Sequence, residues 1–217
     1  MTEVPQPNAL YPTRSGAGAM LGRQLYQRIP SPSILLGITP TGVEVAASAS
    51  QAMGCRFDVI VGAHVRMDGT DVIGAMAEDG DALLDHDFQP GFAQITALEE
   101  AVDRARRVIK SERVLFRGQR AIKSLEGMNV AVVDGHVTSP WKLLAAAVAA
   151  GQLGAIKVWA AAAVSTQAVQ ERIRARRIEF VCPSILMDAK GHARPFGDAN
   201  DSSSERLKSI VLARQAA

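Results

Sequence analysis

The residues best suited to chemistry lie together in the stretch DGHVTSPW, residues 134–141. Asp134 comes directly after four apolar residues, and its carboxylate can accept hydrogen bonds from sugar hydroxyls. A helix that begins just after this turn would offer unpaired backbone N–H groups and the positive end of its dipole, and both favour an anion. The donors for one phosphate group are then the amides of His136, Val137, Thr138 and Ser139, with the hydroxyls of the last two.

The same turn has a second interpretation that does not involve a ligand. Ser139 is a suitable N-cap, and Pro140 fits the first helical position because its missing N–H would be unpaired there anyway. The stretch could then be a well-capped turn at a sheet edge, with His136 as an exposed loop residue instead of a phosphate partner. The spacing of these residues leaves both interpretations open.

Strands and helices alternate along the chain, and this alternation positions the turn. Short apolar runs typical of strands buried on both faces occupy residues 33–38, 57–62, 129–134, 156–164 and 178–183. Helical spacing of apolar residues marks residues 17–29, 41–54, 95–114, 139–151, 165–177 (capped by Ser165 or Thr166) and 201–215. The pattern predicts an α/β fold, a mostly parallel twisted sheet flanked by helices. Ligands in such sheets bind beyond the carboxyl ends of the strands, where Asp134 is expected.

Two other segments fall outside this alternation. Residues 63–91 are rich in Gly and Asp, with short strands near residues 72–77, and a long loop of this kind is more often functional than idle. We expect it to form a small hood. Residues 1–12 contain three prolines and read as a loose N-terminal arm, laid over the domain or disordered, with residues 13–217 as a single domain.

The composition narrows the classes of partner. The net charge is +2, with 47% hydrophobic and 21% charged residues, so no global field favours nucleic acid or anionic lipid. The two cysteines and the isolated His86 and His192 lack metal-ligand spacing, so we expect no metal centre built by side chains at such spacing and surface positions for both histidines. No run approaches the roughly 20 apolar residues that span a bilayer. A cytoplasmic protein without membrane contact is the expectation.

Two basic segments remain to be explained. Residues 104–123 carry eight basic side chains against Glu112, and residues 172–177 read RIRARR. Either could contact nucleic-acid phosphates. Because few aromatic residues are interleaved and the second segment ends a helix, where cations are favoured, solvated helix faces are the preferred interpretation.

The chain resembles the type I phosphoribosyltransferases from about Arg14 to the last helix. The match is best at IGAMAEDG, residues 73–80, and extends to RSGAGAMLGRQL, LLGITPTGVEVA and the strand and acid of VAVVDGHVTSP. The resemblance implies that Asp134 and the loop after it hold the ribose and 5'-phosphate of phosphoribosyl pyrophosphate. It also implies that the turn with Thr41 and Gly42 contacts magnesium-bound pyrophosphate.

Several substrate-holding positions depart from the family pattern. Gly135 replaces a second acid, Ser139-Pro140 replaces Thr-Gly, Pro40 replaces an arginine, and Ala63-His64 replace an Arg-Lys pair. Because catalysis in this family depends on positioning and on stabilising charge on departing pyrophosphate, lost donors lower the rate directly.

These departures imply a site degenerate for phosphoribosyl pyrophosphate. The expected function is a binding or regulatory module for a phosphorylated sugar or nucleotide, with a homodimer as the expected assembly. The alternative is an active, Mg²⁺-dependent phosphoribosyltransferase or derived transferase with altered substrate handling. No catalytic residue is assigned. Trp141 could stack on a base, although it fits better as a packing anchor. Glu78 and Asp79 could bind Mg²⁺ or belong to a solvated turn.

Overall fold

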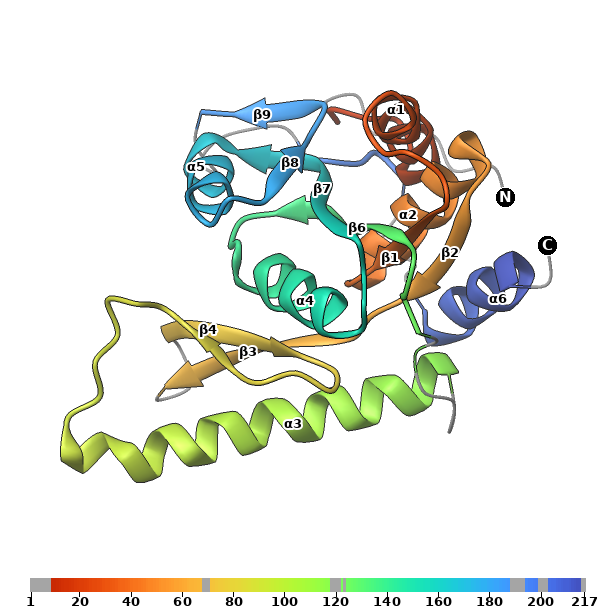
Figure 1. Cartoon of the computed structure of the whole chain (residues 1–217). Helices are drawn as coiled ribbons and strands as arrows, with labels where there is room; N and C mark the ends of the chain where they lie inside the picture. The colour runs from red at the N-terminus through yellow and green to blue at the C-terminus, as the bar shows by residue number, and fades with distance from the viewer. Residues whose placement is uncertain are drawn as a thin grey trace.

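A six-stranded parallel sheet forms the centre of the molecule, as the alternation predicts (Figure 1). The computed structural model describes residues 9–67, 71–117, 122, 124–187, 194–198 and 203–215. The strands run in the order β2-β1-β6-β7-β8, and β9 also pairs with β7. Their bounds are β1 Ser33–Gly37, β2 Arg56–Val59, β6 Asn129–Val137, β7 Lys157–Thr166, β8 Glu179–Val181 and β9 Ser184–Leu186.

Helices cover both faces of this sheet, because successive strand residues point to opposite sides. On one face Leu35 and Ala131 join a core with α1 and α2; on the other, Leu36 and Val132 join a core with α4 and α5. The bounds are α1 Arg14–Tyr26, α2 Pro40–Met53, α4 Trp141–Gln152, α5 Gln167–Ala175 and α6 Ser204–Gln215. The last of these, α6, packs beside α2 on the first face. Thr166 caps α5, which confirms one of the two expected caps.

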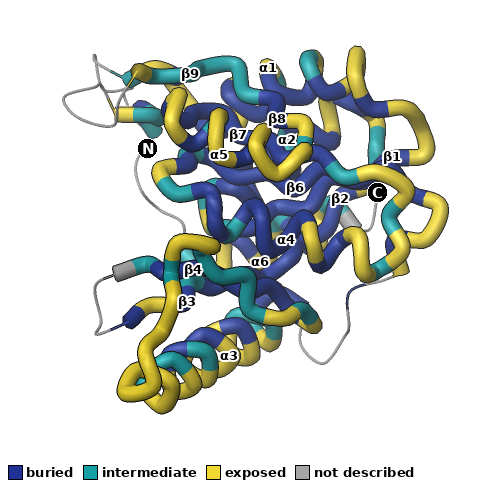
Figure 2. The backbone as a smooth tube through the Cα atoms, turned by 60° about the vertical axis from the view of Figure 1, so that its left-hand side comes forward, coloured by how far each residue is buried: buried dark blue, intermediate teal, exposed yellow. Residues whose placement is uncertain are grey.

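The expected hood is present, and it is more regular than a loop. It consists of β3 Gly62–Met67, β4 Asp71–Ala77, β5 Leu83–Leu84, a 3-10 turn at Phe92–Gln94 and the helix α3 Ile95–Arg117. The three strands form an antiparallel sheet in the order β3-β4-β5. Figure 1 shows α3 running along the β3-β4 hairpin, and Figure 2 shows that the helix keeps an exposed face along its length. The described part of the basic segment 104–123 is therefore largely a solvated helix face, except at its end.

A buried ion pair ties the end of α3 to the point where the hood leaves the sheet. Arg117 contacts Glu78, and both side chains are almost fully buried. Arg117 Nη1 also donates to the carbonyl of Val59 at 3.1 Å, and Glu78 Oε1 accepts from the amide of Val61 at 2.8 Å. Burial raises the pKa of Glu78, while Arg117 and the Val61 amide oppose the rise. Both predictions for Glu78 are wrong, since an enclosed, paired carboxylate is neither a solvated turn residue nor an open Mg²⁺ ligand. Asp79, next to it, does lie in an exposed turn.

The end of the expected N-terminal arm packs on the domain. The Leu10 and Tyr11 amides donate to the carbonyls of Arg194 and Pro195, at 3.0 and 3.1 Å. Tyr11 is buried, and its hydroxyl lies 2.8 Å from Ser184 Oγ. Residues 1–8 and His192 lie outside the described residues. Within the described ranges, no helix combines the length and the apolar character needed to span a bilayer.

Candidate functional site

The strand order creates a switch point between β1 and β6. The connection after β1 runs through α2 on one face of the sheet, whereas the connection after β6 runs through α4 on the other. Ligands of open parallel sheets bind where neighbouring connections diverge in this way. The structure brings the predicted residues Thr41, Gly42, Asp134 and Gly135 together at this point, from the first turn of α2 and the end of β6.

Asp134 is buried at the switch point and is already bonded inside the protein. Its Oδ1 accepts a hydrogen bond from the Thr39 hydroxyl and one from the Gly135 amide at 2.6 Å. Thr39 also caps α2, because its Oγ1 accepts from the Gly42 amide at 2.9 Å. Burial raises the pKa of Asp134, and the hydrogen bond from Thr39 and the charge of Lys142 oppose the rise. One of the two carboxylate oxygens is thus used for internal structure.

The first turn of α2 lies directly on β6. A Cβ at Gly135 would lie 2.7 Å from the Cβ of Thr41, and a Cβ at Gly42 would lie 2.6 Å from the carbonyl oxygen of Val133. Real Cβ atoms do not approach other atoms this closely, so neither position accepts a side chain without movement of the backbone or of Thr41. Thr41 therefore fills the space above Gly135.

The loop predicted after Asp134 is shorter than expected. The strand β6 continues to Val137, and His136 and Val137 pair with Val164 and Ser165 of β7. The prediction that these two residues belong to a phosphate-holding loop is wrong, because β7 is long enough to extend the ladder past Asp134. Only Thr138, Ser139 and Pro140 connect β6 to α4.

The start of α4 also differs from the prediction. The helix begins at Trp141, with Pro140 at the N-cap and no side-chain cap hydrogen bond. Pro140 already has helical dihedrals, φ −75° and ψ −17°, and its carbonyl accepts from the Leu144 amide at 3.0 Å. The predicted Ser139 cap is therefore wrong, since the proline itself sets the first turn of the helix.

Trp141 is a packing anchor, as preferred from the sequence. Its side chain is buried in the core on the α4 and α5 face of the sheet. The guanidinium carbon of Arg176 lies 5.7 Å from the centre of its ring. The ring is therefore on the opposite face from α2 and Thr41, and it does not fill the switch-point crevice.

A pocket of about 370 Å³ lies in the hood between β3 and α3, and Lys142 at the start of α4 completes its lining. Its polar lining residues are His64, Arg66, Arg104, Glu112 and Lys142. The charge of Lys142 acts on Asp134 as well as on His64 and Glu112, so the pocket adjoins the buried acid. With three cations against one carboxylate, the lining favours an anionic ligand.

Two titratable groups in this pocket have shifted pKa values. Burial, with the charges of Lys142 and Arg66, lowers the pKa of His64 to about 4. Burial raises the pKa of Glu112, while Lys142 opposes the rise. His64 is therefore neutral at pH 7, and its Nε2 is buried with no hydrogen-bond partner among the described residues. That nitrogen is available to a ligand hydroxyl or ring nitrogen.

Sequence reasoning missed Thr39 and Lys142 and gave His64 no role beyond replacing a basic pair. One signal for Lys142 was present in the sequence. The residue follows Pro140 and Trp141 in the first turn of a helix, where a cation is unfavourable for the helix dipole, so its presence there points to another role. For Thr39 the signal was its place between a strand and a Pro-led helix, which is typical of an N-cap.

His86 is exposed, as expected, but it does have acidic neighbours. Its ring nitrogens lie 3.2 Å from Asp85 Oδ1 and 3.0 Å from Asp87 Oδ1. Consecutive residues of one exposed loop bring these groups together. Residue spacing alone did not anticipate the contacts, because a local turn creates them. An exposed acidic turn of this kind is not sufficient to indicate a metal site.

Comparison with known proteins gives structural relatives only. No protein-family model and no curated protein matches the sequence. Among solved structures, TT1426 from Thermus thermophilus is 25% identical, with a TM-score of 0.77, over 94% of this chain and 98% of that one. A purine phosphoribosyltransferase from Pyrococcus horikoshii is 11% identical, with a TM-score of 0.48, over 85% and 87%. An orotate phosphoribosyltransferase from Mycobacterium tuberculosis, in complex with 5-phospho-alpha-D-ribosyl 1-diphosphate, is 18% identical, with a TM-score of 0.42, over 79% and 74%.

Proposed function

We propose that this chain, which has a type I phosphoribosyltransferase-like fold, binds a phosphorylated sugar or nucleotide in the pocket between β3, α3 and the start of α4 and does not catalyse ordinary phosphoribosyl transfer. It acts as a binding or regulatory module. The ligand lies against Arg66, Arg104 and Lys142.

One observation carries this proposal: a pocket with three cationic side chains adjoins the buried Asp134. At the switch point itself, Thr41 packs on Gly135 and the Thr39 hydroxyl donates to one oxygen of Asp134. The neighbouring pocket of about 370 Å³ is within the usual size range of ligand pockets.

The chemistry of the pocket suits a phosphate ester. Arg66, Arg104 and Lys142 can donate charge-assisted hydrogen bonds to phosphate oxygens, each worth roughly 1.5 to 3 kcal/mol. The neutral His64 offers Nε2 to a hydroxyl or base nitrogen on the same ligand. A ligand with a phosphate at one end and a sugar or base at the other matches both groups.

Transfer from phosphoribosyl pyrophosphate would need more than this pocket supplies. Positions 40, 63 and 135 hold Pro, Ala and Gly, none of which offers a charged side chain to stabilise a departing pyrophosphate or to grip ribose hydroxyls. Losing several such groups lowers the rate by several powers of ten. We therefore expect the site to bind a phosphorylated ligand without catalysing phosphoribosyl transfer.

Calorimetry on the full chain tests the proposal. Ribose 5-phosphate, AMP and phosphoribosyl pyrophosphate are titrated with and without Mg²⁺, and pyrophosphate release is measured with candidate bases. At least one of the first two ligands should bind, and Lys142→Met should weaken it about tenfold. Lys110→Met, which removes an exposed lysine from α3, is the matched control and should change the affinity less than twofold.

The opposite result has a clear signature. Tight, Mg²⁺-dependent binding of phosphoribosyl pyrophosphate with steady pyrophosphate release would overturn the proposal in favour of an active transferase with altered substrate handling. Equal effects of Lys142→Met and Lys110→Met on the affinity would instead show that the ligand does not bind in this pocket.

A further inference from the structure

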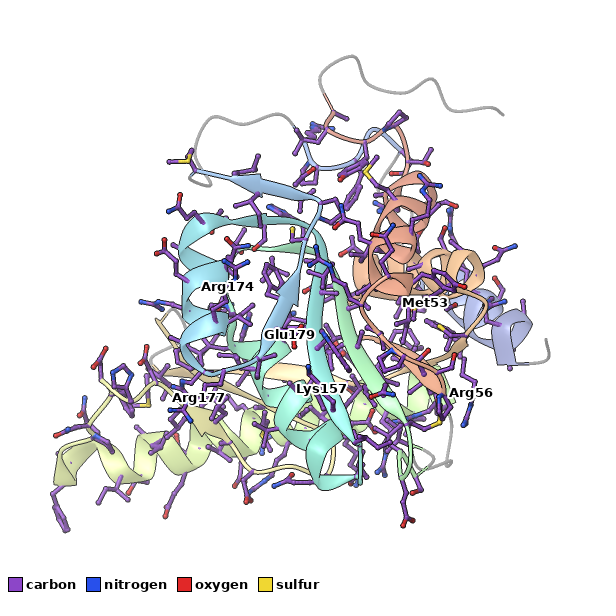
Figure 3. The ribbon with its side chains drawn as sticks, turned by 45° about the horizontal axis from the view of Figure 1, so that its top comes forward. Met53, Arg56, Lys157, Arg174, Arg177 and Glu179 are labelled. Atoms are coloured by element: carbon purple, nitrogen blue, oxygen red, sulfur yellow. The ribbon has the colours of Figure 1, made fainter. Side chains whose placement is uncertain are left out.

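A second pocket, of about 350 Å³, lies at the opposite end of the sheet. Arg28 follows α1, and Arg174 and Arg177 lie at the end of α5. These three arginines line the pocket together with Ile178 and the strand β8. In Figure 3, Arg174, Arg177 and Glu179 lie close together on α5, the turn after it and β8. Glu179 begins β8, so the pocket is at the amino ends of the parallel strands, whereas Asp134 is near a carboxyl end.

The guanidinium groups of this pocket are not paired with other side chains of the described residues. Within the described ranges, Arg28, Arg174 and Arg177 make no side-chain hydrogen bond or salt bridge, although Arg28 acts through its charge on Glu179. Glu179 also lines the pocket, but its carboxylate contacts Lys157 and accepts from Trp159 Nε1 at 3.1 Å. The pocket therefore keeps an excess of positive charge.

The backbone at Arg177 gives a second, independent indication. Arg177 has φ +58°, a left-handed conformation, and it follows the C-cap residue of α5. Glycine is the usual residue just after a helix C-cap because a Cβ is strained there. A residue that accepts such strain at a helix end often does so because its side chain is needed.

All four arginines of the run RIRARR are exposed, which confirms the prediction of a solvated segment. They still differ in their surroundings. Arg176 lies over the ring of Trp141. Arg174 and Arg177 line the pocket, while Arg172, on the same helix, does not.

From these observations we propose that Arg28, Arg174 and Arg177 form a second anion site, which binds the phosphoryl group of a small phosphorylated molecule such as a nucleoside diphosphate. Guanidinium groups match phosphate oxygens in paired hydrogen bonds, and three of them suit a diphosphate. The half-buried Ile178 adds apolar surface beside these arginines. A compact pocket fits a small molecule better than an extended polymer. The site is separate from the hood pocket, so the proposed module would respond to a second ligand.

Titration of inorganic pyrophosphate into the full chain carrying Lys142→Met tests this site, because that background weakens the hood pocket. We expect one pyrophosphate per chain. Arg174→Gln and Arg177→Gly should each weaken binding at least tenfold, and Arg172→Gln, which removes the same charge from the same helix, less than twofold. Arg177→Gly also relieves the left-handed strain, so its melting temperature should not fall, and lost binding cannot be attributed to unfolding.

Three results would overturn the proposal. The first is no pyrophosphate binding in this background. The second is an equal loss in Arg172→Gln, which would indicate diffuse attraction by surface charge. The third is binding of an RNA duplex with higher affinity than pyrophosphate and dependence on the same arginines, which would make the surface a nucleic-acid interface. Failure of the hood pocket would appear separately, in the comparison of Lys142→Met with the unmodified chain.

Discussion

Thr41 and Gly135 fit each other so closely that a side chain at position 135 would collide with the threonine: the added Cβ would lie 2.7 Å from Thr41 Cβ. The lack of a side chain at position 135 is therefore matched by the presence of one at position 41. The two residues are far apart in sequence but form one packing arrangement in space.

Gly135→Ala should destabilise the protein by about 1 to 3 kcal/mol, the usual effect of overpacking a filled site. Chemical denaturation measures the change in the free energy of unfolding. Gly151→Ala is the matched control, because a Cβ at that exposed position in α4 meets nothing within 4 Å. It should be neutral or slightly stabilising.

The same contact predicts a compensation. In the double variant Gly135→Ala with Thr41→Gly, most of the destabilisation due to Gly135→Ala should disappear relative to Thr41→Gly alone. Additive effects of the two changes would mean that the two positions are not coupled.

Thr39→Ala should lower the free energy of unfolding by about 1 to 2 kcal/mol, because it removes the cap of α2 and the hydrogen bond to Asp134. Thr39→Ser keeps both bonds and should lose less than half as much. Thermal and denaturant unfolding of the two variants provide the measurement. Equal losses would show that the methyl group, not the hydroxyl, is responsible.

Arg117→Met should destabilise the chain by roughly 3 to 5 kcal/mol, since it leaves Glu78 buried without its partner. The control is Arg113→Met, whose partner Asp79 is half exposed and lies 3.9 Å away, and it should lose less than about 1 kcal/mol. Adding Glu78→Gln to Arg117→Met should recover part of the loss. A similar cost for both single arginine variants would contradict the anchoring role of Glu78.

The contribution of His64 to stability should fall on acidification between the ordinary pKa of histidine, 6.5, and the pKa of about 4 of His64 in the folded chain. The raised pKa values of Glu78, Glu112 and Asp134 act in the opposite direction, so the comparison with a His64 variant isolates this contribution. In this range the unfolded chain binds a proton that His64 does not bind in the fold, so protons favour unfolding. His64→Gln should remove a fall of about 1 to 2 kcal/mol, a value reduced for the partial exposure of the ring. Burial also lowers the pKa of His136. This residue therefore adds a smaller fall in stability, which remains in the His64→Gln variant.

His86→Gln is the control for this pH dependence, because its side chain is mostly exposed. Unfolding free energies at pH 7, 6 and 5 would be compared for the three proteins. A slope in His64→Gln as steep as that of the unmodified chain would refute the assignment.

The order of strands and helices was predictable because the spacing of apolar residues along the chain follows which side chains are buried. Residues such as Leu35 and Val132 are apolar since both faces of the sheet are covered, and the sequence carries that pattern without knowledge of the fold. The switch-point location of Asp134 followed from the same pattern. The burial of Trp141 was also consistent with local rules.

The details of the site were less accessible because they depend on distant contacts. The length of β6 is set by its partner β7, so the end of the strand at Val137 could not be read from residues 134–141 alone. The pairing of Glu78 with Arg117 joins residues from different elements, and no local spacing reveals it. The pocket residues His64 and Lys142 meet only because the hood folds back over α4.

The close crossing of α1 and α2 limits how far α2 can move. A Cβ at Gly18 or Gly22 would lie 2.5 Å from a carbonyl oxygen of α2, so the two helices touch backbone to backbone. The first turn of α2 packs on β6 as well, so α2 is held from two sides. A larger residue at either glycine would therefore separate the two helices and disturb the packing of α2 on the sheet.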